Sequence, residues 1–338
     1  MTDKGVRWLT EADVVDLVDL EDAIEALERG LRWEGEGKAQ NVPKALGTWG
    51  DGSSMHSLGS MFPEAGYVGF KTWANTKRGA AAVFALFDAN NGALLALMEA
   101  AGLGQMRTSA ISGLASRWLA REDATTMALI GSGLQSMTQV AAVAAVRPLS
   151  EVRVFSPTPE KRRAFVEKAK ASFGFEVKEA ASLEAATEGA AIVTAVTRAR
   201  EPFIQARHLD KGAHFNAVGA ILPANAEFTQ DVFDRARVLV VDHLPNVKLA
   251  SREFRERFGE DEAGWGGVRL LSDVIAKGEQ RPADADLTLF KAMGMGISDL
   301  SVAVTVYERA LEREVGAFVE QAPRRTPRWR TAVTASAA

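Results

Sequence analysis

The stretch from Thr126 to Ser136 limits what this chain can fold into more than any other, because it joins a short apolar run to a glycine turn. Residues 127–130 have the composition of a buried strand, Gly131-Ser132-Gly133 follows, and residues 135–146 are typical of a helix. A dinucleotide-binding turn needs this context, since its first glycine allows the tight turn and its second lets a pyrophosphate approach the helix N-terminus. An ordinary glycine turn shares the short pattern, so the flanking sequence has to decide.

Beyond the turn, apolar runs and helical stretches alternate. Strands are predicted at 152–155, 191–196, 214–218 and 238–241, and helices at 160–173 and 183–188. Alternation of this kind implies a parallel sheet with helices on both faces. We therefore predict an α/β fold with a Rossmann-type doubly wound sheet over residues 116–304.

The chain before residue 116 has a different pattern. A capped helix is predicted at 10–37, an extended segment at 41–44, and strands between 66 and 99, with Asn91-Gly92 as a strong hairpin signal. A long helix, 106–121, connects this part to the parallel sheet. We assign residues 1–115, together with 305–338, to an α+β domain with an antiparallel sheet. An amphipathic helix predicted at 300–314 enters this domain across the boundary. The Pro-, Arg- and Ala-rich tail, 321–338, is expected to fray.

Composition excludes several classes of protein. The 338 residues include 40 Lys and Arg against 44 Asp and Glu, so the chain lacks the basic excess of a nucleic-acid-binding protein. It has no cysteine, and no apolar run approaches the roughly 20 residues of a membrane span. The histidines and carboxylates show no metal-binding spacing, so no metal site is predicted. A cytoplasmic location is the expectation.

The segment after the second strand of the parallel sheet bears on cofactor choice. An NAD site usually has an acidic residue here for the ribose hydroxyls, but this chain continues Ser156-Pro157-Thr158 and adds Arg162. Two hydroxyls and a positive charge suit a 2′-phosphate, so NADP(H) is favoured and NAD(H) is the alternative. The same residues could also be only a helix N-cap with a solvated basic first turn.

Two basic residues, Lys71 and Arg107, are candidates for binding an anion. Lys71 lies in an apolar strand between Phe70 and Trp73, and Arg107 lies in the segment that opens the predicted long helix. Taken singly, each is more typical of a surface charge. Among the four histidines, His56 alone falls outside the nucleotide half, and we keep it as the candidate side-chain acid, although a structural or surface role is more common.

Several short motifs, taken in order, resemble those of the ornithine cyclodeaminase/μ-crystallin family over about residues 10–310. They are Gly69-Phe70-Lys71 with Asn75 and Gly79, Leu86-Phe87-Asp88 with Asn91-Gly92, Met106-Arg107-Thr108-Ser109-Ala110, Gly131-Ser132-Gly133-Leu134-Gln135, Asn216-Ala217-Val218-Gly219-Ala220, and Phe290-Lys291-Ala292-Met293-Gly294 leading to Asp299.

The resemblance implies a Rossmann domain joined to a substrate-binding domain that forms a homodimer. It implies hydride transfer between NAD(P) and a carbon that bears nitrogen, on a small amino or imino acid. Lys71 and Arg107 would bind the substrate carboxylate. We predict that these two residues and His56 are the catalytic residues. Lys44 is also predicted to bind the substrate, because it matches a basic position of the family where Arg is common, although Lys cannot copy the bidentate fork of Arg. Met293 and Gly294 complete the predicted substrate site. The predicted cofactor-binding residues are Thr108, Gly131, Ser132, Gly133, Leu134, Gln135, Ser156, Thr158, Arg162, Val196, Thr197, Val218 and Gly219.

One departure from the family pattern concerns the reaction. Cyclodeaminases of the family have an Asp two residues after the glycine that matches Gly219, where this chain has Ile221, and Pro223 and Glu227 keep the frame. Isoleucine cannot transfer a proton. We therefore predict reduction of an imine of a 2-oxo acid, cyclic or acyclic, or the reverse amino-acid dehydrogenation. The alternatives are an ornithine cyclodeaminase and a non-catalytic protein that binds small molecules.

Overall fold

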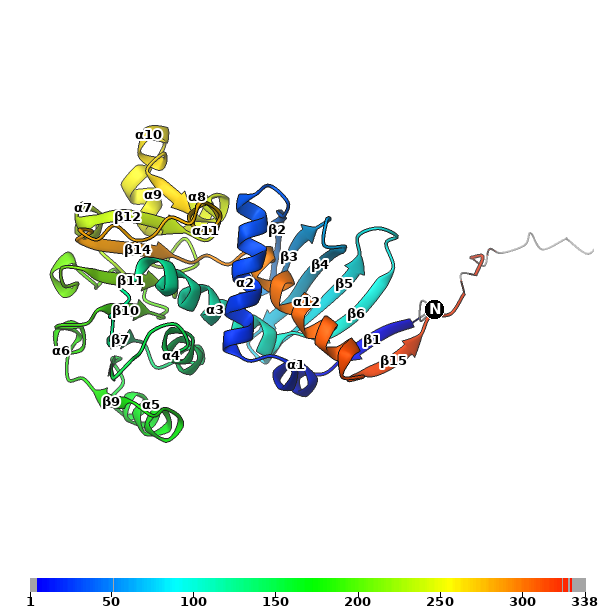
Figure 1. The fold of residues 1–338 in the computed structure, drawn as a ribbon, viewed down its shortest axis with the longest axis horizontal. Helices are drawn as coiled ribbons and strands as arrows, with labels where there is room; N and C mark the ends of the chain where they lie inside the picture. Colours follow the sequence, from blue (N-terminus) through cyan, green and yellow to red (C-terminus); the bar gives the residue numbers. More distant parts are fainter. Residues whose placement is uncertain (1–4, 51, 324, 328, 330–338) are drawn as a thin grey trace, which may run out of the picture.

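The computed structural model describes residues 5–50, 52–323, 325–327 and 329, and it shows two lobes, each built on its own sheet (Figure 1). The first sheet takes its strands from both ends of the chain, and the second takes them from the middle. Much of the tail predicted to fray, 321–338, lies outside the described residues.

The first sheet has the order β15-β1-β6-β5-β4-β3-β2. Its strands are β1 (Gly5–Leu9), β2 (Gln40–Trp49), β3 (Ser53–Phe62), β4 (Tyr67–Thr76), β5 (Gly79–Asp88), β6 (Leu94–Glu99) and β15 (Ala317–Glu320). The predicted hairpin joins β5 to β6, with Gly92 at φ 72°. The predicted antiparallel pairing is confirmed from β2 to β6 and between β1 and β15, whereas β1 pairs with β6 in parallel, so the sheet is mixed.

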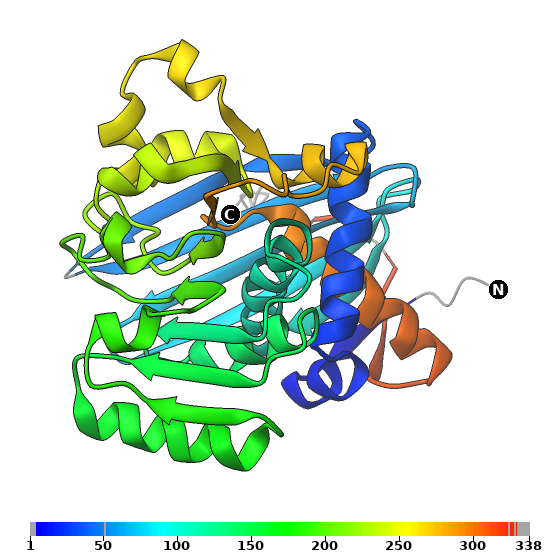
Figure 2. The same ribbon diagram turned by 60° about the vertical axis from the view of Figure 1, so that its left-hand side comes forward.

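Three helices, α1 (Glu11–Leu17), α2 (Leu20–Gly35) and α12 (Gly296–Glu312), pack beside this sheet (Figure 2). The single helix predicted at 10–37 is two helices, since Asp19 caps a second start as Thr10 caps the first. Strand pairing puts Met55, Phe70 and Val83 together on the face opposite to Lys71. These three apolar side chains are exposed, so in a single chain this face is uncovered.

The second sheet is parallel throughout, in the order β13-β12-β14-β11-β10-β7-β8-β9. Its strands are β7 (Thr126–Ile130), β8 (Glu151–Phe155), β9 (Glu176–Glu179), β10 (Ile192–Ala195), β11 (Ala213–Ala217), β12 (Ala236–Val241), β13 (Val268–Leu270) and β14 (Leu287–Lys291). The chain runs outward from β7 in one direction through β8 and β9, and then returns to β10 on the other side. This reversal creates the crevice in which doubly wound folds bind their ligands, at the carboxyl ends of the strands.

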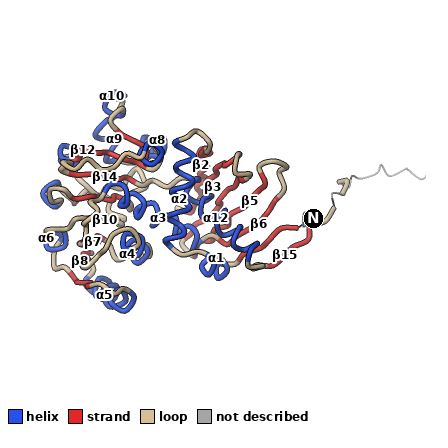
Figure 3. The backbone as a smooth tube through the Cα atoms, in the orientation of Figure 1, coloured by secondary structure: helices blue, strands red, loops and turns tan. Residues whose placement is uncertain are grey.

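The helices of the second lobe flank this sheet (Figure 3). They are α4 (Ser136–Ala144), α5 (Pro159–Ser172), α6 (Leu183–Thr187), α7 (Asp231–Arg235), α8 (Leu244–Ala250), α9 (Arg252–Phe258), α10 (Glu262–Trp265) and α11 (Leu271–Lys277), with a 3₁₀ turn η1 (Ala206–His208). The sequence analysis did not predict β9, β13 or β14, nor the helices from α7 to α11.

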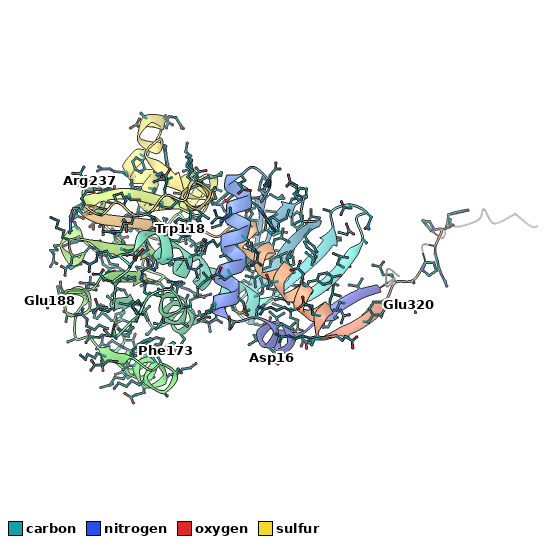
Figure 4. The ribbon with its side chains drawn as sticks, viewed as in Figure 1. Asp16, Trp118, Phe173, Glu188, Arg237 and Glu320 are labelled. Atoms are coloured by element: carbon teal, nitrogen blue, oxygen red, sulfur yellow. The ribbon has the colours of Figure 1, made fainter. Side chains whose placement is uncertain are left out.

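The helix α3 (Ala101–Leu119) joins the lobes. It starts five residues before the predicted start at 106, so Arg107 lies about two turns into the helix rather than at its beginning. Figure 4 places Trp118, near its C-terminus, on the side of the second lobe, whereas Glu320 of β15 lies at the opposite end of the molecule. The predicted domain boundaries at 115/116 and 304/305 fall inside α3 and α12. Helix α3 packs against elements of both lobes, whereas α12 packs against α1, α2, α3 and the strands of the first sheet.

Candidate active site

The predicted nucleotide-binding residues lie at one edge of the second sheet, where its parallel strands end. Gly131 follows β7, Ser156 follows β8, and Thr197 comes shortly after β10. Val218 and Gly219 follow β11, and the segment 292–294 follows β14. Because carboxyl ends of parallel strands meet at one edge, the alternation read from the sequence is enough to bring these segments together.

The glycine turn has the geometry that a phosphate needs. Gly131 has φ +118°, and a Cβ there would lie 2.8 Å from the carbonyl oxygen of Val196, so only glycine fits. A Cβ on Gly133 would meet nothing within 4 Å, which leaves open space before the N-terminus of α4. The residues therefore fit the pyrophosphate of a dinucleotide, held by backbone N–H groups and the helix dipole.

Helix α3 fixes this turn from the side of the first lobe. Gln105 donates to the carbonyl oxygen of Leu134 at 2.9 Å, and Gln139 of α4 donates to the carbonyl oxygen of Thr108 at 3.2 Å. Leu134 is itself exposed. The helix that carries Arg107 is thereby tied to the nucleotide turn.

The residues after β8 that were predicted to bind the ribose end of the cofactor already have hydrogen-bond partners within the chain. Ser156 is buried and shares a 2.9 Å hydrogen bond with Ser132, while Thr158 makes no capping bond to α5. Arg162 donates to the carbonyl oxygen of Ser156 at 2.6 Å and to Glu179 at 2.8 Å. Its charge is thus already balanced by a carboxylate, and its place in the cofactor site stays a prediction.

Glu227 organises the loops after β10 and β11, and its role was missed beyond its use as a sequence marker. One of its oxygens accepts from the backbone N–H of Thr197 at 2.7 Å, and the other accepts from that of Gly219 at 2.9 Å. Burial raises the pKa of Glu227, an effect that Lys291 opposes. The buried carboxylate therefore holds together two predicted cofactor-binding segments.

Opposite this edge, a cluster of charges lies between β4, α3 and α12. Lys71 is almost fully buried, and its Nζ lies 2.6 Å from Oδ1 of Asp299, which is fully buried. Nε of Arg107 lies 3.2 Å from the same oxygen. Burial, and next the charge of Arg107, lower the pKa of Lys71 to about 8 against the opposing effect of Asp299. Lys71 is therefore not the solvent-facing lysine that a strand position suggests.

Lys44 and His56 extend this cluster around Trp73. Nζ of Lys71 and of Lys44 lie 5.1 and 5.9 Å from the centre of the indole ring, within cation–π range. His56 stacks on the same ring with centroids 4.6 Å apart. Burial, and then the charge of Lys44, lower the pKa of His56, so a neutral imidazole is favoured. The structure thus brings His56 beside the predicted anion-binding residues, whereas His214 is buried among Thr288 and Asn216.

The turn at Met293–Gly294 forms a wall beside Arg107. Gly294 has φ +84°, and a Cβ there would lie 3.0 Å from Nη1 of Arg107. The buried carboxylate of Asp242 accepts from the backbone N–H of Met293 at 2.9 Å and of Gly294 at 2.7 Å. Asn246 donates to the carbonyl oxygen of Gly294 at 2.7 Å. Asp242 and Asn246 therefore set the turn that faces the guanidinium.

Sequence reasoning missed the carboxylates Asp299 and Asp242 as functional groups. Asp299 stood only at the end of a family motif, and Asp242 follows β12 at the strand-end position from which the other loops were chosen, so that position was a usable signal. Across the described residues, no group of three or more His, Cys, Asp or Glu side chains is placed to hold a metal ion. Nor does any described helix have the length and apolar character needed to cross a membrane.

Together these features define a class of protein: a Rossmann-type fold whose strand-end edge lies beside a buried cluster of cationic side chains. The model of the ornithine cyclodeaminase/mu-crystallin family matches residues 6–314, and the chain belongs to that family. The resemblance inferred from the short motifs is confirmed.

Individual relatives agree in sequence and in structure. The chain is 32% identical to a Δ1-pyrroline-2-carboxylate reductase of Bacillus cereus, over 70% of this chain and 73% of the relative. The structure of the Thermococcus litoralis Δ1-pyrroline-2-carboxylate reductase in complex with NADH and L-proline superposes with a TM-score of 0.85 at 28% identity, covering 92% and 99% of the two chains. An archaeal alanine dehydrogenase, a dimer with bound NAD, also gives 0.85 at 27% identity, covering 93% and 99%. The predicted fold, a Rossmann-type lobe beside an α+β lobe, is confirmed.

Proposed function

We propose that this protein is an NAD(P)H-dependent oxidoreductase that reduces the imine of a 2-oxo acid to an amino acid, or runs the reverse amino-acid dehydrogenation. The observation that carries the proposal is the pair Lys71 and Arg107, which converge on Asp299 opposite the glycine turn. Relatives named as imine reductase and amino-acid dehydrogenase support it.

The anchor for the substrate carboxylate follows from the charges. Lys71 and Arg107 share a single buried carboxylate, so the three side chains carry a net positive charge. A substrate carboxylate would neutralise it at a site where burial strengthens electrostatic attraction. Asp299 keeps both cations in place before the substrate binds.

Proton transfer to nitrogen has one candidate donor among the anchoring cations. A Lys71 with a pKa of about 8 is mostly protonated at neutral pH, yet it gives up a proton far more readily than an ordinary lysine. Asp299, at 2.6 Å, would stabilise the charged form before transfer. His56, beside Trp73, is the second candidate acid.

A nicotinamide cofactor, when bound, supplies the hydride. We propose that Gly131, Ser132, Gly133, Leu134 and Gln135 hold its pyrophosphate, that Thr108, Val196, Thr197, Val218 and Gly219 lie along it, and that Ser156, Thr158 and Arg162 meet its adenosine ribose. NADP(H) over NAD(H) remains our proposal from the missing acid after Phe155, since the solved relatives have NADH or NAD bound.

We also propose a homodimer through the uncovered face of the first sheet, with the nucleotide lobes outermost. The exposed Met55, Phe70 and Val83 share that face, and exposed apolar patches commonly mark protein interfaces. The archaeal alanine dehydrogenase was solved as a dimer. Light scattering at micromolar concentration should give twice the mass of one chain, and a monomer would contradict this.

A cytoplasmic location is part of the proposal and rests on composition alone.

The reaction is tested by substrate class. NADPH and NADH oxidation should be followed with Δ1-pyrroline-2-carboxylate and with 2-oxo acids plus ammonium. Ornithine with a catalytic amount of NAD(P) should be followed for proline and ammonia. Because Ile221 cannot assist proton transfer, worth about 10² to 10⁴-fold, cyclodeaminase activity should be at least about two orders of magnitude below imine reduction. Rapid proline formation without turnover of any imine would establish ornithine cyclodeaminase instead.

A further inference from the structure

The helix that carries Asp299 begins without a cap of its own. The N-cap residue of α12 is Met295, a side chain that makes no capping hydrogen bond. Backbone N–H groups in the first turn of a helix have no partner inside the helix and need an acceptor from outside. Asn41 of β2 supplies one, because its Oδ1 accepts from the backbone N–H of Ile297 at 2.9 Å. The start of α12 therefore depends on a side chain from a distant strand.

Glu34, in the last turn of α2, holds Asn41 in the orientation that this cap needs. The amide nitrogen of Asn41 donates to Oε1 of Glu34 at 2.8 Å, and it also lies 3.8 Å from Sδ of Met295. An ionised carboxylate accepts hydrogen bonds and cannot donate them, so it selects the amide nitrogen and leaves the amide oxygen for Ile297. One amide thus connects the end of α2 with the start of α12.

The start of α12 also carries the carboxylate of the cationic cluster. Asp299 lies two residues after Ile297, and its Oδ1 is 2.6 Å from Nζ of Lys71 and 3.2 Å from Nε of Arg107. Because Asp299 is fully buried, water cannot replace these contacts if the first turn of the helix moves. The position of this turn therefore sets how the two cations are held.

The surroundings of Glu34 make its charge sensitive to pH near neutrality. Burial raises the pKa of Glu34 to about 7, and the charges of Asp242, after β12, and Asp273, on α11, raise it further. The hydroxyl of Ser272 on α11 and the amide of Asn41 oppose this rise. Within the described residues, Glu34 makes no ion pair with a lysine or an arginine. Its carboxyl group is therefore charged in only part of the molecules at pH 7.

We propose that Glu34 is a positioning residue for the substrate site. Its carboxylate orients Asn41, whose amide oxygen holds the first turn of α12, and that turn fixes Asp299 and the two cations beside it. The inference rests on the proposed function, since it concerns the same site. Uptake of a proton by Glu34 weakens the link, because a neutral carboxyl group is a weaker acceptor than a carboxylate and can itself donate to the amide oxygen.

The first experiment measures KM for the imine in Glu34→Ala, Asn41→Ala and the double variant at about pH 7.5, where most Glu34 is ionised. Asn41→Ala should raise KM about fivefold, the equilibrium factor for the loss of one helix cap, and Glu34→Ala should raise it by up to that factor. The dissociation constant of the cofactor should change much less. Because Glu34 acts through Asn41, the double variant should be no worse than Asn41→Ala alone.

Hydrogen exchange tests the same link without any substrate. In both alanine variants the amides of the first turn of α12, residues 296–299, should exchange about fivefold faster than in the wild type, because the turn opens more often without its cap. Glu36→Ala is the matched control, since Glu36 is an exposed carboxylate two residues after Glu34 and pairs with Lys38. Its KM and its exchange should equal those of the wild type.

The pH profile separates this positioning role from simple support of the fold. In the wild type, kcat/KM should decrease below pH 7 to a plateau about fivefold lower, because neutral Glu34 still accepts, but more weakly. Glu34→Gln accepts from Asn41 and cannot ionise, so this step should be absent from its profile. A step that belongs to His56 would persist in Glu34→Gln.

Unchanged KM and exchange in both alanine variants would overturn the inference and leave the proposed function standing. A loss of thermal stability without any change in KM, or an acidic step that persists in Glu34→Gln, would overturn it as well. If the wild-type protein turned over no imine, the proposed function itself would be wrong, and the role of Glu34 at a substrate site would fall with it.

Discussion

The side of the site proposed for the nucleotide and the side proposed for the substrate are formed by different kinds of chemical group. The nucleotide side consists of backbone and small residues, such as Gly131 and Gly133, at the ends of parallel strands. The side proposed for the substrate consists of the long cationic side chains of Lys71 on β4 and Arg107 on α3, held by Asp299 of α12. A site made of backbone depends on local conformation, whereas a site made of charges depends on how distant elements pack. Substitutions should therefore separate the two sides cleanly.

The largest effect is expected from the anchor. Lys71→Ala and Arg107→Ala should each lower kcat/KM, by an amount that corresponds to roughly 2–4 kcal/mol of lost transition-state stabilisation, since removal of one partner leaves a buried charge unpaired. Binding of NADPH or NADH, measured by fluorescence titration, should change much less in Lys71→Ala. Lys161→Ala, on the first turn of α5, serves as a control for the loss of one lysine. If both anchor variants kept the wild-type KM, the carboxylate site would have to lie elsewhere.

Two glycine substitutions test the comparison directly. Gly131→Ala and Gly294→Ala both force a side chain into positive φ, a strain of about 1–3 kcal/mol, and both leave the charges intact. Gly131→Ala pushes a methyl group toward Val196 and should weaken cofactor binding. Gly294→Ala pushes one toward Arg107 and should raise KM for the imine.

The readouts for this pair are the dissociation constant of the cofactor and the KM of the imine, with thermal unfolding as the check on folding. Each variant should change mainly the constant of its own side. If both variants changed both constants to the same extent, the two sides would be one coupled unit and the comparison would fail.

This division also explains what the sequence could reveal. The Gly131 turn and the Asn91-Gly92 hairpin were predicted because each pattern sets the conformation of its own residues. The contact of Lys71 with Asp299 joins residues 228 positions apart, and no local pattern encodes it. The start of α3 was misplaced because Ala100, its N-cap residue, makes no side-chain capping bond and so gives no signal. Strand β14 was missed because it ends in Lys291, which is fully buried although a lysine in a strand usually faces solvent.

The pH dependence tests the charged side alone. Lys71 can bind an anion or donate a proton only while it is protonated. Because its pKa is about 8, kcat/KM should fall above pH 8, and this alkaline limb of the pH profile should approach a tenfold loss per pH unit, as expected for the loss of about one proton. The affinity for the cofactor should not change over the same pH range. Asp299→Asn removes the charge that raises the pKa of Lys71, so the limb should move to lower pH. A limb that stays in place in Asp299→Asn would exclude Lys71 as its source.

The smallest effect is expected at the adenosine end, where the nucleotide side depends on charges as well as backbone. The hydroxyl of Ser156 lies at the end of β8, where NAD-specific proteins usually have an acid, and Ser156→Asp should favour NADH over NADPH because a carboxylate repels the 2′-phosphate.

The charge of Arg162 is now shared with Glu179 at 2.8 Å. Glu179→Gln should free that charge and strengthen NADPH binding by about 1 kcal/mol or less, the scale of a partly exposed ion pair, with little change for NADH. Glu176→Gln, on the same strand β9 but paired with Lys178, is the control. The assignment would be wrong if the wild-type enzyme bound NADH about ten times more tightly than NADPH and neither variant changed that ratio. Ser156, Thr158 and Arg162 would then not contact the 2′-position of the ribose.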